Sequence, residues 1–312
     1  LQLWGFDAGM HRLGNLLLHF VGGLAVFFIA TRVLRYATDH SQLALAPAHV
    51  PLAGLLTMAL FVVHPLRVES VVWIAERKDV LCGAFYLLAV AAWVYARIHG
   101  SVRWRILSLI FALLAAMAKP MAVSLPFTLL ALEHWPFARY RLRMVDVGAM
   151  IRTLASKLDY ICVAAFTSAM ALMAQDRGNA LVRLDSLDIT TRVLNAAHSL
   201  WFYLGKWLVP TKLSPLYAFP DSVMAHGAVA WLGLAAALAV ALAVCWRART
   251  VFTPWFAVSM SYFFCLLPVL GVVQVGMQAA ADRYTYLSMV GITIAAATVA
   301  AASVSAASAA AV

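Results

Sequence analysis

Apolar runs close to membrane-spanning length recur along the whole chain, and no other feature restricts its fold as strongly. About nine such runs of roughly 15 to 22 residues can be drawn, at 13–34, 49–63, 79–97, 104–118, 121–135, 157–174, 227–246, 252–272 and 286–305. The mean hydropathy is +0.89, and a soluble domain with that value would expose too much apolar surface to water. The sequence therefore predicts an all-α fold, a polytopic transmembrane bundle of about nine or ten hydrophobic helices.

A tenth segment, 192–209, mixes polar and apolar residues and reads RVLNAAHSLWFYLGKWLV. It is compatible with an interfacial helix and with a crossing one. If it does not cross, the basic loops ARYRLR (138–143) and WRART (246–250) fall on one side, which the positive-inside rule assigns to the cytoplasm. The remaining polar loops then share the extracytoplasmic side.

The charge and the cysteines argue against other classes of protein. The formal net charge is +10, but the basic residues sit in short clusters between apolar runs, where anionic lipid headgroups explain them more simply than nucleic acid does. The four cysteines lie inside apolar runs without a CxxC motif, so we expect small residues that face lipid or the core. The sequence begins LQLWGFDAGM and ends AAATVAAASVSAASAAAV, and we expect residues 1–312 to be a single membrane domain truncated at both ends.

The stretch HPLRVESVVWIAERKDVL, residues 64–81, places mixed charge between two apolar runs. Pro65 disfavours helical geometry at His64 and so ends one run. Glu69 and Glu76 are seven apart, which on one helix would set them near the same face. Interface anchors require only one or two cations, whereas carboxylates beside cations suit a site that binds an anionic group and manages a proton. Both interpretations remain open for this stretch, which ends in Arg77, Lys78 and Asp79.

A polar stripe marks the first apolar run, where His11, Asn15 and His19 are spaced four apart. On a helix these side chains share one face, and polar groups in hydrocarbon require a partner or a cavity. Hydrogen bonding between helices is the interpretation we favour. A zinc site is less expected, because no carboxylate or cysteine completes a ligand set nearby.

Two further groups fall on the predicted extracytoplasmic side. The segment QAAADRYTYL carries Asp282, Arg283, Tyr284 and Tyr286 at the start of the last run. An arginine can bind phosphate oxygens with its planar fork and a tyrosine can bind a sugar ring, although tyrosines at this depth also form ordinary aromatic belts. Lys119, in AKPM, lies at the break between two short apolar runs.

The order of five motifs resembles the membrane portion of the TMTC-type O-mannosyltransferases and their bacterial relatives. The motifs are LWGFDAGMHRLGNLLLH, HPLRVESVVWIAERKDVL, AKPMAVSLPFTLLALEHWP, KWLVPTKLSPLYAFP and QVGMQAAADRYTYLSMVG. The resemblance implies a GT-C-like membrane domain, followed in the family by tetratricopeptide repeats that these 312 residues lack. It also implies transfer of a mannose-type hexose from a polyprenyl-phosphate carrier to a protein hydroxyl, at the extracytoplasmic face of a membrane of the bacterial inner-membrane type. The implied partners are that lipid-linked sugar, a protein acceptor and membrane lipids, and no metal or other cofactor is indicated.

By this resemblance the catalytic carboxylate belongs in the first extracytoplasmic loop, of which only Asp7 remains, so we expect the base to lie before Leu1. The implied reaction is an inverting displacement, in which a carboxylate takes the acceptor's proton and cations stabilise the departing phosphate. The residues expected to act in catalysis are Asp7, His64, Glu69 and Glu76. Those expected to bind substrate are His11, Asn15, Arg77, Lys78, Asp79, Lys119, Asp282, Arg283, Tyr284 and Tyr286.

Two other classes of protein fit the same composition. A secondary transporter also has many spans and a few intramembrane polar residues, but its binding residues lie near mid-bilayer in related halves. Here the charges gather at the ends of spans, and HPLRVES and ADRYTYL do not resemble each other. A non-catalytic membrane scaffold is the third reading, because the expected base is not found in the chain.

Overall fold

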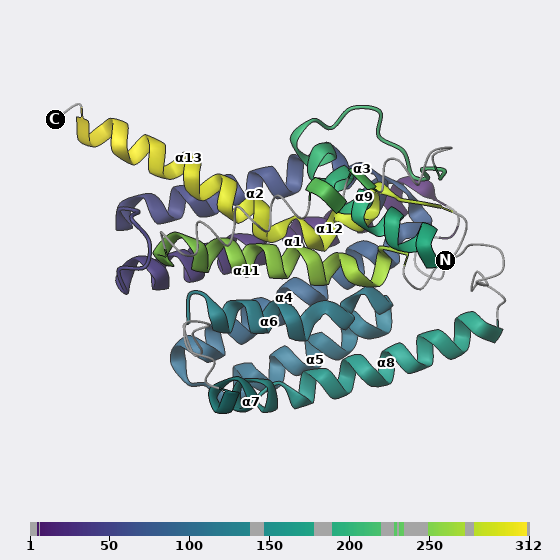
Figure 1. Ribbon diagram of the computed structural model, residues 1–312, viewed down its shortest axis with the longest axis horizontal. Coiled ribbons are helices and arrows are strands. Elements are labelled where there is room, and N and C mark those ends of the chain that lie inside the picture. Colours follow the sequence, from purple (N-terminus) through teal and green to yellow (C-terminus); the bar gives the residue numbers. More distant parts are fainter. Residues whose placement is uncertain are drawn as a thin grey trace.

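The computed structural model describes residues 5, 7–137, 147–177, 189–219, 228–229, 231–233, 249–271 and 278–310. In these residues the regular secondary structure is helical, apart from an isolated bridge between Tyr217 and Ala280. The prediction of an all-α fold is therefore confirmed (Figure 1). Most of the predicted span 227–246 and the basic loop 138–143 lie outside the described residues.

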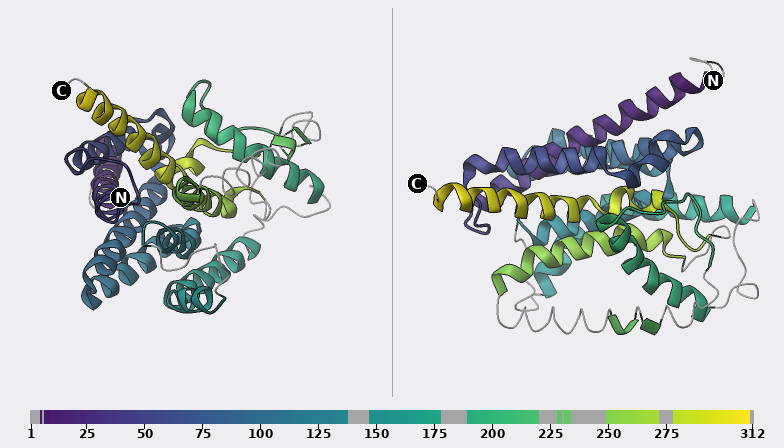
Figure 2. Two further views of the ribbon diagram at one scale, coloured as in Figure 1. Left: turned by 60° about the vertical axis from the view of Figure 1, so that its left-hand side comes forward. Right: turned by 90° about the horizontal axis from the view of Figure 1, so that it is seen from above.

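Long helices pack side by side to form the bundle. They are α1 (Ala8–Asp39), α2 (Val50–Val63), α4 (Arg77–His99), α5 (Val102–Ala118), α6 (Leu125–His134), α8 (Leu158–Arg177), α9 (Ile189–Leu208), α11 (Arg249–Leu266) and α13 (Val290–Ala310), with the short α7 (Val147–Ala155) before α8. Helix α4 packs against α5 and α1, α2 contacts both α1 and α13, and α11 lies against α6. Figure 2 shows that the start of α1 and the end of α13 extend beyond the bundle at opposite ends.

Three helical segments are long and apolar enough to cross a membrane: Ala8–Asp39, Ile74–His99 and Val290–Ala307. A fourth is obtained if Pro47–Val63 and Pro65–Val72, which meet at a 53° bend, count as one broken span. The chain is therefore a membrane protein. Prolines and 3-10 turns interrupt two of the other predicted spans, since Pro120–Ser124 precedes α6 and Leu267–Val269 follows α11. The predicted spans 104–118 and 157–174 correspond to the continuous helices α5 and α8, and the apolar part of α8, Leu158–Ala171, is shorter than a membrane span.

One end of the bundle is built from short, broken segments instead of continuous helices. These are η2 (Pro65–Arg67), α3 (Val68–Val72), η3 (Ile74–Glu76), η4 (Pro120–Ser124), η6 (Asp282–Tyr284) and α12 (Thr285–Ser288). His64 and Lys119 are both extended, with ψ of 130° and 137°, because each precedes a proline that disfavours helical geometry before it. The breaks turn the chain across the end of the bundle and bring charged side chains together there.

The first half of helix α1 carries its polar residues inward and its large apolar residues outward, whereas Ile29, Val33 and Leu34 of the second half are buried in the core. His11, Asn15 and His19 are buried in the bundle. Large side chains on the other faces of the helix are exposed, among them Leu13, Leu16, Leu17, Phe20 and Leu24. A helix that faces lipid requires this arrangement of polar side chains inside and apolar side chains outside, since only apolar side chains can contact hydrocarbon without a hydrogen-bond partner.

Candidate functional site: a charged mouth at one end of the bundle

Charged side chains from three stretches that are far apart in sequence meet at the broken end of the bundle. We call this site the mouth, and its charged residues are Glu69, Glu76, Lys78, Asp79, Lys119 and Arg283. They come from α3 and η3, from the first turn of α4, from the residue before η4, and from η6. The structure thus brings together residues that the sequence placed in three separate motifs.

Arg283 is the centre of an ion-pair chain across the mouth. Glu69 accepts from the Arg283 guanidinium with one oxygen and from the Arg283 backbone N–H with the other, the latter at 2.8 Å. Glu76 Oε1 lies 3.8 Å from Arg283 Nε and 3.8 Å from Lys78 Nζ. Burial alone would lower the pKa of Arg283, but the bond and charge of Glu69 outweigh it and raise that pKa, so the guanidinium stays charged.

The two glutamates reach Arg283 from a broken helix. The expectation that they lie on one face of a single helix was wrong, because α3 ends at Val72 and the extended backbone of Trp73 separates it from η3. The break turns Glu76 back toward Arg283, while Trp73 places its ring 6.0 Å from the guanidinium carbon. One Glu76 oxygen, Oε2, is buried and has no hydrogen-bond partner in the described part of the chain.

A second ion pair lies beside the first. Lys119 donates to the carboxylate of Asp79, and Asp79 also interacts with Glu76. Asp79, Lys119, Arg283 and Tyr286 line one small cavity of about 10 Å³, which is the room of a single water molecule. A sugar phosphate therefore fits only above this cavity, or in it after the ion pairs separate.

Tyr284 forms one side of the mouth. Its ring centroid lies 5.2 Å from the Arg283 guanidinium carbon and 6.0 Å from Lys119 Nζ, and its hydroxyl accepts from the amide of Gln278 at 3.0 Å. A tyrosine ring beside two cations contributes a polarisable, partly apolar surface, which is the kind of surface that sugar rings contact.

Arg77 joins α4 to α1. Its Nε donates to Asn15 Oδ1 at 3.0 Å and its Nη2 donates to the carbonyl of His11 at 2.7 Å. Asn15 in turn donates to the carbonyl of Val71 at 3.2 Å. These contacts confirm hydrogen bonding between helices for the stripe, and they use Arg77 as a clamp rather than as an open phosphate ligand.

Tyr286 is a buried core residue rather than part of an aromatic belt. Its hydroxyl bonds to His19 Nδ1 at 2.8 Å, and His19 Nε2 lies 3.2 Å from the carbonyl of Val62. The ring packs directly over Gly83 of α4, where a Cβ atom would lie 2.2 Å from a ring carbon. Only glycine permits this approach, so Gly83 determines how closely α12 packs against α4.

Two of the residues expected to act in catalysis have structural partners. His64 accepts from the N–H of Leu66 at 3.3 Å through Nδ1, so its Nε2 donates to the carbonyl of Trp207 at 3.0 Å, and this bond joins α2 to the end of α9. Asp7 is exposed and caps α1 by accepting from the N–H of Met10 at 2.9 Å.

Asp282, next to Arg283 in the chain, binds the loop that follows α9. It accepts from the N–H of Ser214 at 2.8 Å and from the hydroxyl of Tyr217 at 2.9 Å, which fixes the loop after α9 against η6. Burial raises the pKa of the Asp282 carboxyl, and its bonds to Tyr217 and Ser214 reduce that effect.

The residues of α9 that bind the backbone just before η6 were not predicted from the sequence. Asn195 donates to the carbonyl of Ala279 at 3.0 Å, and the hydroxyl of Tyr203 accepts from the N–H of Ala281 at 3.2 Å. The signal was present, because Asn195, Ser199 and Tyr203 are spaced four apart and so share one helix face. Arg67 was also missed, since nothing in the sequence separates it from Arg77.

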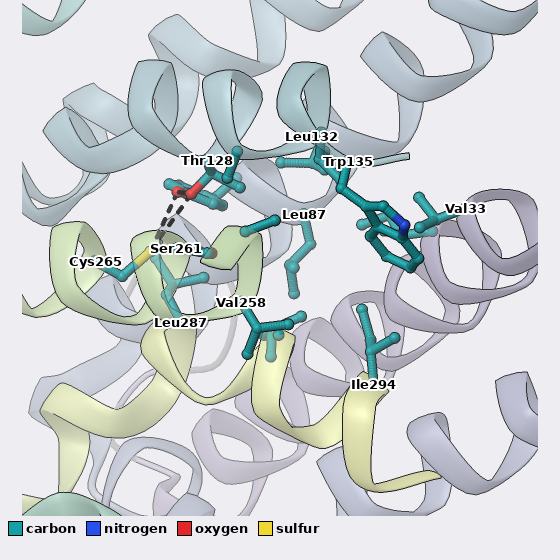
Figure 3. A pocket seen from close by; sticks show the side chains of 17 residues that line it. Val33, Leu87, Thr128, Leu132, Trp135, Val258, Ser261, Cys265, Leu287 and Ile294 are labelled. Atoms are coloured by element: carbon teal, nitrogen blue, oxygen red, sulfur yellow. Dashed lines mark hydrogen bonds between the residues drawn. The ribbon is translucent and has the colours of Figure 1, made fainter. Parts of the chain in front are cut away.

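An apolar cavity of about 80 Å³ lies inside the bundle, next to the mouth. Figure 3 shows Thr128 and Leu132 of α6 across from Val258 and Cys265 of α11, with Leu87 of α4 beside them. Leu287 lines this cavity and also the small cavity of the mouth. The charged site and the apolar interior are therefore adjacent.

Comparison with known proteins gives a partial relationship. "Protein O-mannosyl-transferase TMTC4" of Homo sapiens is 31% identical over 134 residues, which cover 38% of this chain and 17% of that protein. Part of this chain resembles a protein O-mannosyl-transferase. The Mus musculus protein of the same name is 30% identical over 133 residues, with the same shares. The match covers only 17% of the length of these curated relatives. No protein-family model and no solved structure matches the chain.

Proposed function

We propose that this chain is the membrane part of a glycosyltransferase. It would move a mannose-type hexose from a polyprenyl-phosphate carrier to a protein hydroxyl at the extracytoplasmic face. The observation that carries the proposal is the mouth itself, where three carboxylates and three cations from separate segments meet at one end of a membrane bundle. The partial similarity to proteins named O-mannosyl-transferases supports the same class of reaction.

In the proposed reaction the cations and the carboxylates of the mouth have different roles. The acceptor oxygen attacks the anomeric carbon, the bond from that carbon to the phosphate oxygen breaks, and its electron pair leaves with the phosphate. Arg283 and Lys119 are positioned to stabilise this developing charge once the phosphate replaces their carboxylate partners. A carboxylate takes the acceptor's proton. In the described part of the chain Glu76 Oε2 has no hydrogen-bond partner and is the candidate for that task.

The position of the polar residues favours a lipid-linked donor over a transported solute. The buried polar residues of α1 are engaged in bonds between helices, whereas the ion pairs lie at the end of the bundle. The apolar cavity beside the mouth supports a donor with a hydrocarbon tail. A transported solute would instead require binding groups near mid-bilayer.

The test is transfer by the full-length protein in its own membrane. Radiolabelled polyprenyl-phosphate mannose is offered together with protein acceptor, and label is followed into protein and into the vesicle lumen. Covalent transfer supports the proposal, and uptake without transfer identifies a transporter. If neither transfer nor uptake is observed, the protein is a scaffold.

Two variants, with transfer counted per folded molecule, locate the reaction at the mouth. Arg283→Gln should lower transfer by about 10²-fold or more, as expected when a group that stabilises developing charge is removed. Arg105→Gln removes an arginine that pairs with Asp159 outside the mouth, and transfer should be unchanged. Equal activity of the two variants would disprove the assignment of Arg283.

A further inference from the structure

Arg67 is a buried cation that the proposed reaction does not use. The residue ends η2 and is 2% exposed. Its guanidinium carbon lies 4.7 Å from the ring centroid of Phe61 and 5.3 Å from that of Tyr286. Its Nη1 donates to the carbonyl of Thr285 at 2.9 Å. Arg67 therefore contacts the turn that carries Arg283, from the side of α2.

The charge of Arg67 has no counter-ion in the described part of the chain. Its Nε and Nη2 are buried without a hydrogen-bond partner there, and the charges that act on it include no carboxylate. Arg283 and Lys119, in contrast, are each paired with a carboxylate. An unpaired buried charge strongly disfavours folding, and two ring faces with one hydrogen bond offset only part of that penalty.

Stability alone does not explain an arginine at this position. A neutral glutamine could donate the same bond to the carbonyl of Thr285 without burying a charge. The positive charge itself must therefore have a use, and its surroundings indicate which. Tyr286, which stacks on Arg67, also lines the small cavity shared by Asp79, Lys119 and Arg283. Arg67 is thus one aromatic ring away from the place where the ion pairs would open.

We propose that Arg67 is a positioning residue of the mouth, whose uncompensated charge attracts the phosphate of the lipid-linked donor and whose bond to Thr285 fixes the turn bearing Arg283. The inference rests on the proposed function. Glu69 and Asp79 neutralise Arg283 and Lys119, so those pairs exert little net attraction on an anion. A fixed charge in a low-dielectric interior acts over a longer distance than an exposed one, because little water screens it.

The experiment measures binding of two lipids that differ only in the phosphate. The purified full-length protein, reconstituted in nanodiscs, is titrated with polyprenyl monophosphate and with polyprenol of the same length. Arg67→Gln should weaken binding of polyprenyl monophosphate by about tenfold or more and leave binding of polyprenol unchanged. Arg67→Lys keeps the charge and should retain most of the preference for the phosphate.

Arg97→Gln is the matched control for loss of stability. Arg97 pairs with the buried Glu133, outside the mouth, so its loss should lower thermal stability but not the phosphate preference. If Arg67→Gln binds both lipids normally, or loses both equally, the inference is overturned while the proposed function stands. If the wild-type protein binds neither lipid, the proposed donor is wrong and the inference falls with it. If Arg67→Gln does not fold, Arg67→Lys decides, because loss of its phosphate preference would overturn the proposal.

Discussion

Glu69 holds Arg283 at two points, since one carboxylate oxygen accepts from the backbone N–H at 2.8 Å and the other accepts from the guanidinium. The two residues are 214 positions apart in sequence, so this contact joins the α3 corner to the η6 turn. Both side chains are largely buried, with 7% and 14% of their surface exposed. A pair of this kind should affect both the stability of the mouth and its chemistry.

Removal of either partner should destabilise the protein strongly. Glu69→Gln and Arg283→Gln each leave a largely buried charge without its main partner, which typically costs about 3 to 5 kcal/mol. The double variant leaves neither charge and should lose less than the sum of the two single losses. Thermal unfolding of the four proteins in one detergent measures the coupling, and additive losses would show that the two side chains do not interact in solution.

Substitution of Gly83 by alanine should destabilise the protein, whereas the same substitution at another helical glycine should not. Gly83→Ala places a Cβ 2.2 Å from the ring of Tyr286, and relief of that overlap should cost about 1 to 3 kcal/mol. Gly205→Ala in α9 is the control, because no atom lies within 4 Å of its Cβ. That substitution should be neutral or stabilise by about 0.5 to 1 kcal/mol, since alanine favours helix over glycine. Unfolding midpoints in the reverse order would contradict the packing described here.

The sequence predicted that distant motifs meet at one end of the bundle, on the condition that 192–209 does not cross the membrane. Successive spans alternate between the two sides of a membrane, so on that condition the number of apolar runs places HPLRVES, AKPM and ADRYTYL on the same side. The ion pairs of Glu69 with Arg283 and of Asp79 with Lys119 confirm that these motifs meet. Periodicity likewise predicted that His11, Asn15 and His19 face other helices, because hydrocarbon cannot satisfy them.

The partners within the mouth could not be predicted from the sequence. Periodicity shows which face a residue occupies, but the partner depends on how helices cross and where they break. Arg77 therefore looked like a phosphate ligand and instead binds α1, and Tyr286 looked interfacial and is buried. The break at Trp73 has no proline or glycine to mark it, so the apolar pattern around it reads as one helix.

The stability of the mouth should depend on pH through Asp282. Burial raises the folded-state pKa of this carboxyl above its usual 3.8, so the folded protein holds the proton more tightly than the unfolded chain. Stability should therefore fall as pH rises from about 3.8 through the folded pKa, and stay constant above it. Asp282→Asn does not titrate, so the unfolding midpoint of the wild type relative to this variant should decrease across that window. Asp39→Asn, at an exposed site outside the mouth, should leave the profile unchanged, and a relative midpoint that rises with pH would refute the assignment.

Glu133→Gln is a control for Glu69→Gln, because it removes the charge of a buried carboxylate that lies outside the mouth. Glu133 is fully buried at the end of α6, where Oε1 lies 2.9 Å from Lys157 Nζ and Oε2 lies 3.2 Å from Arg97 Nε. The start of α6, in contrast, follows η4 and Lys119, so the helix joins the mouth to this cluster. Glu133→Gln should therefore destabilise the protein by about 3 to 5 kcal/mol, much as Glu69→Gln does, because it weakens a buried ion pair.

The two variants should differ in transfer per folded molecule. Glu69→Gln alters the site of the proposed reaction and should lose activity even when only folded protein is counted. Glu133→Gln should retain it, because its charges stabilise the junction of α4, α6 and α8 and contact none of the mouth residues. The measurement is labelled-mannose transfer at a temperature where both variants are folded, normalised to folded protein by near-ultraviolet circular dichroism. Equal losses in the two variants would mean that Glu69 acts on activity only through stability, and its place in the reaction would have to be abandoned.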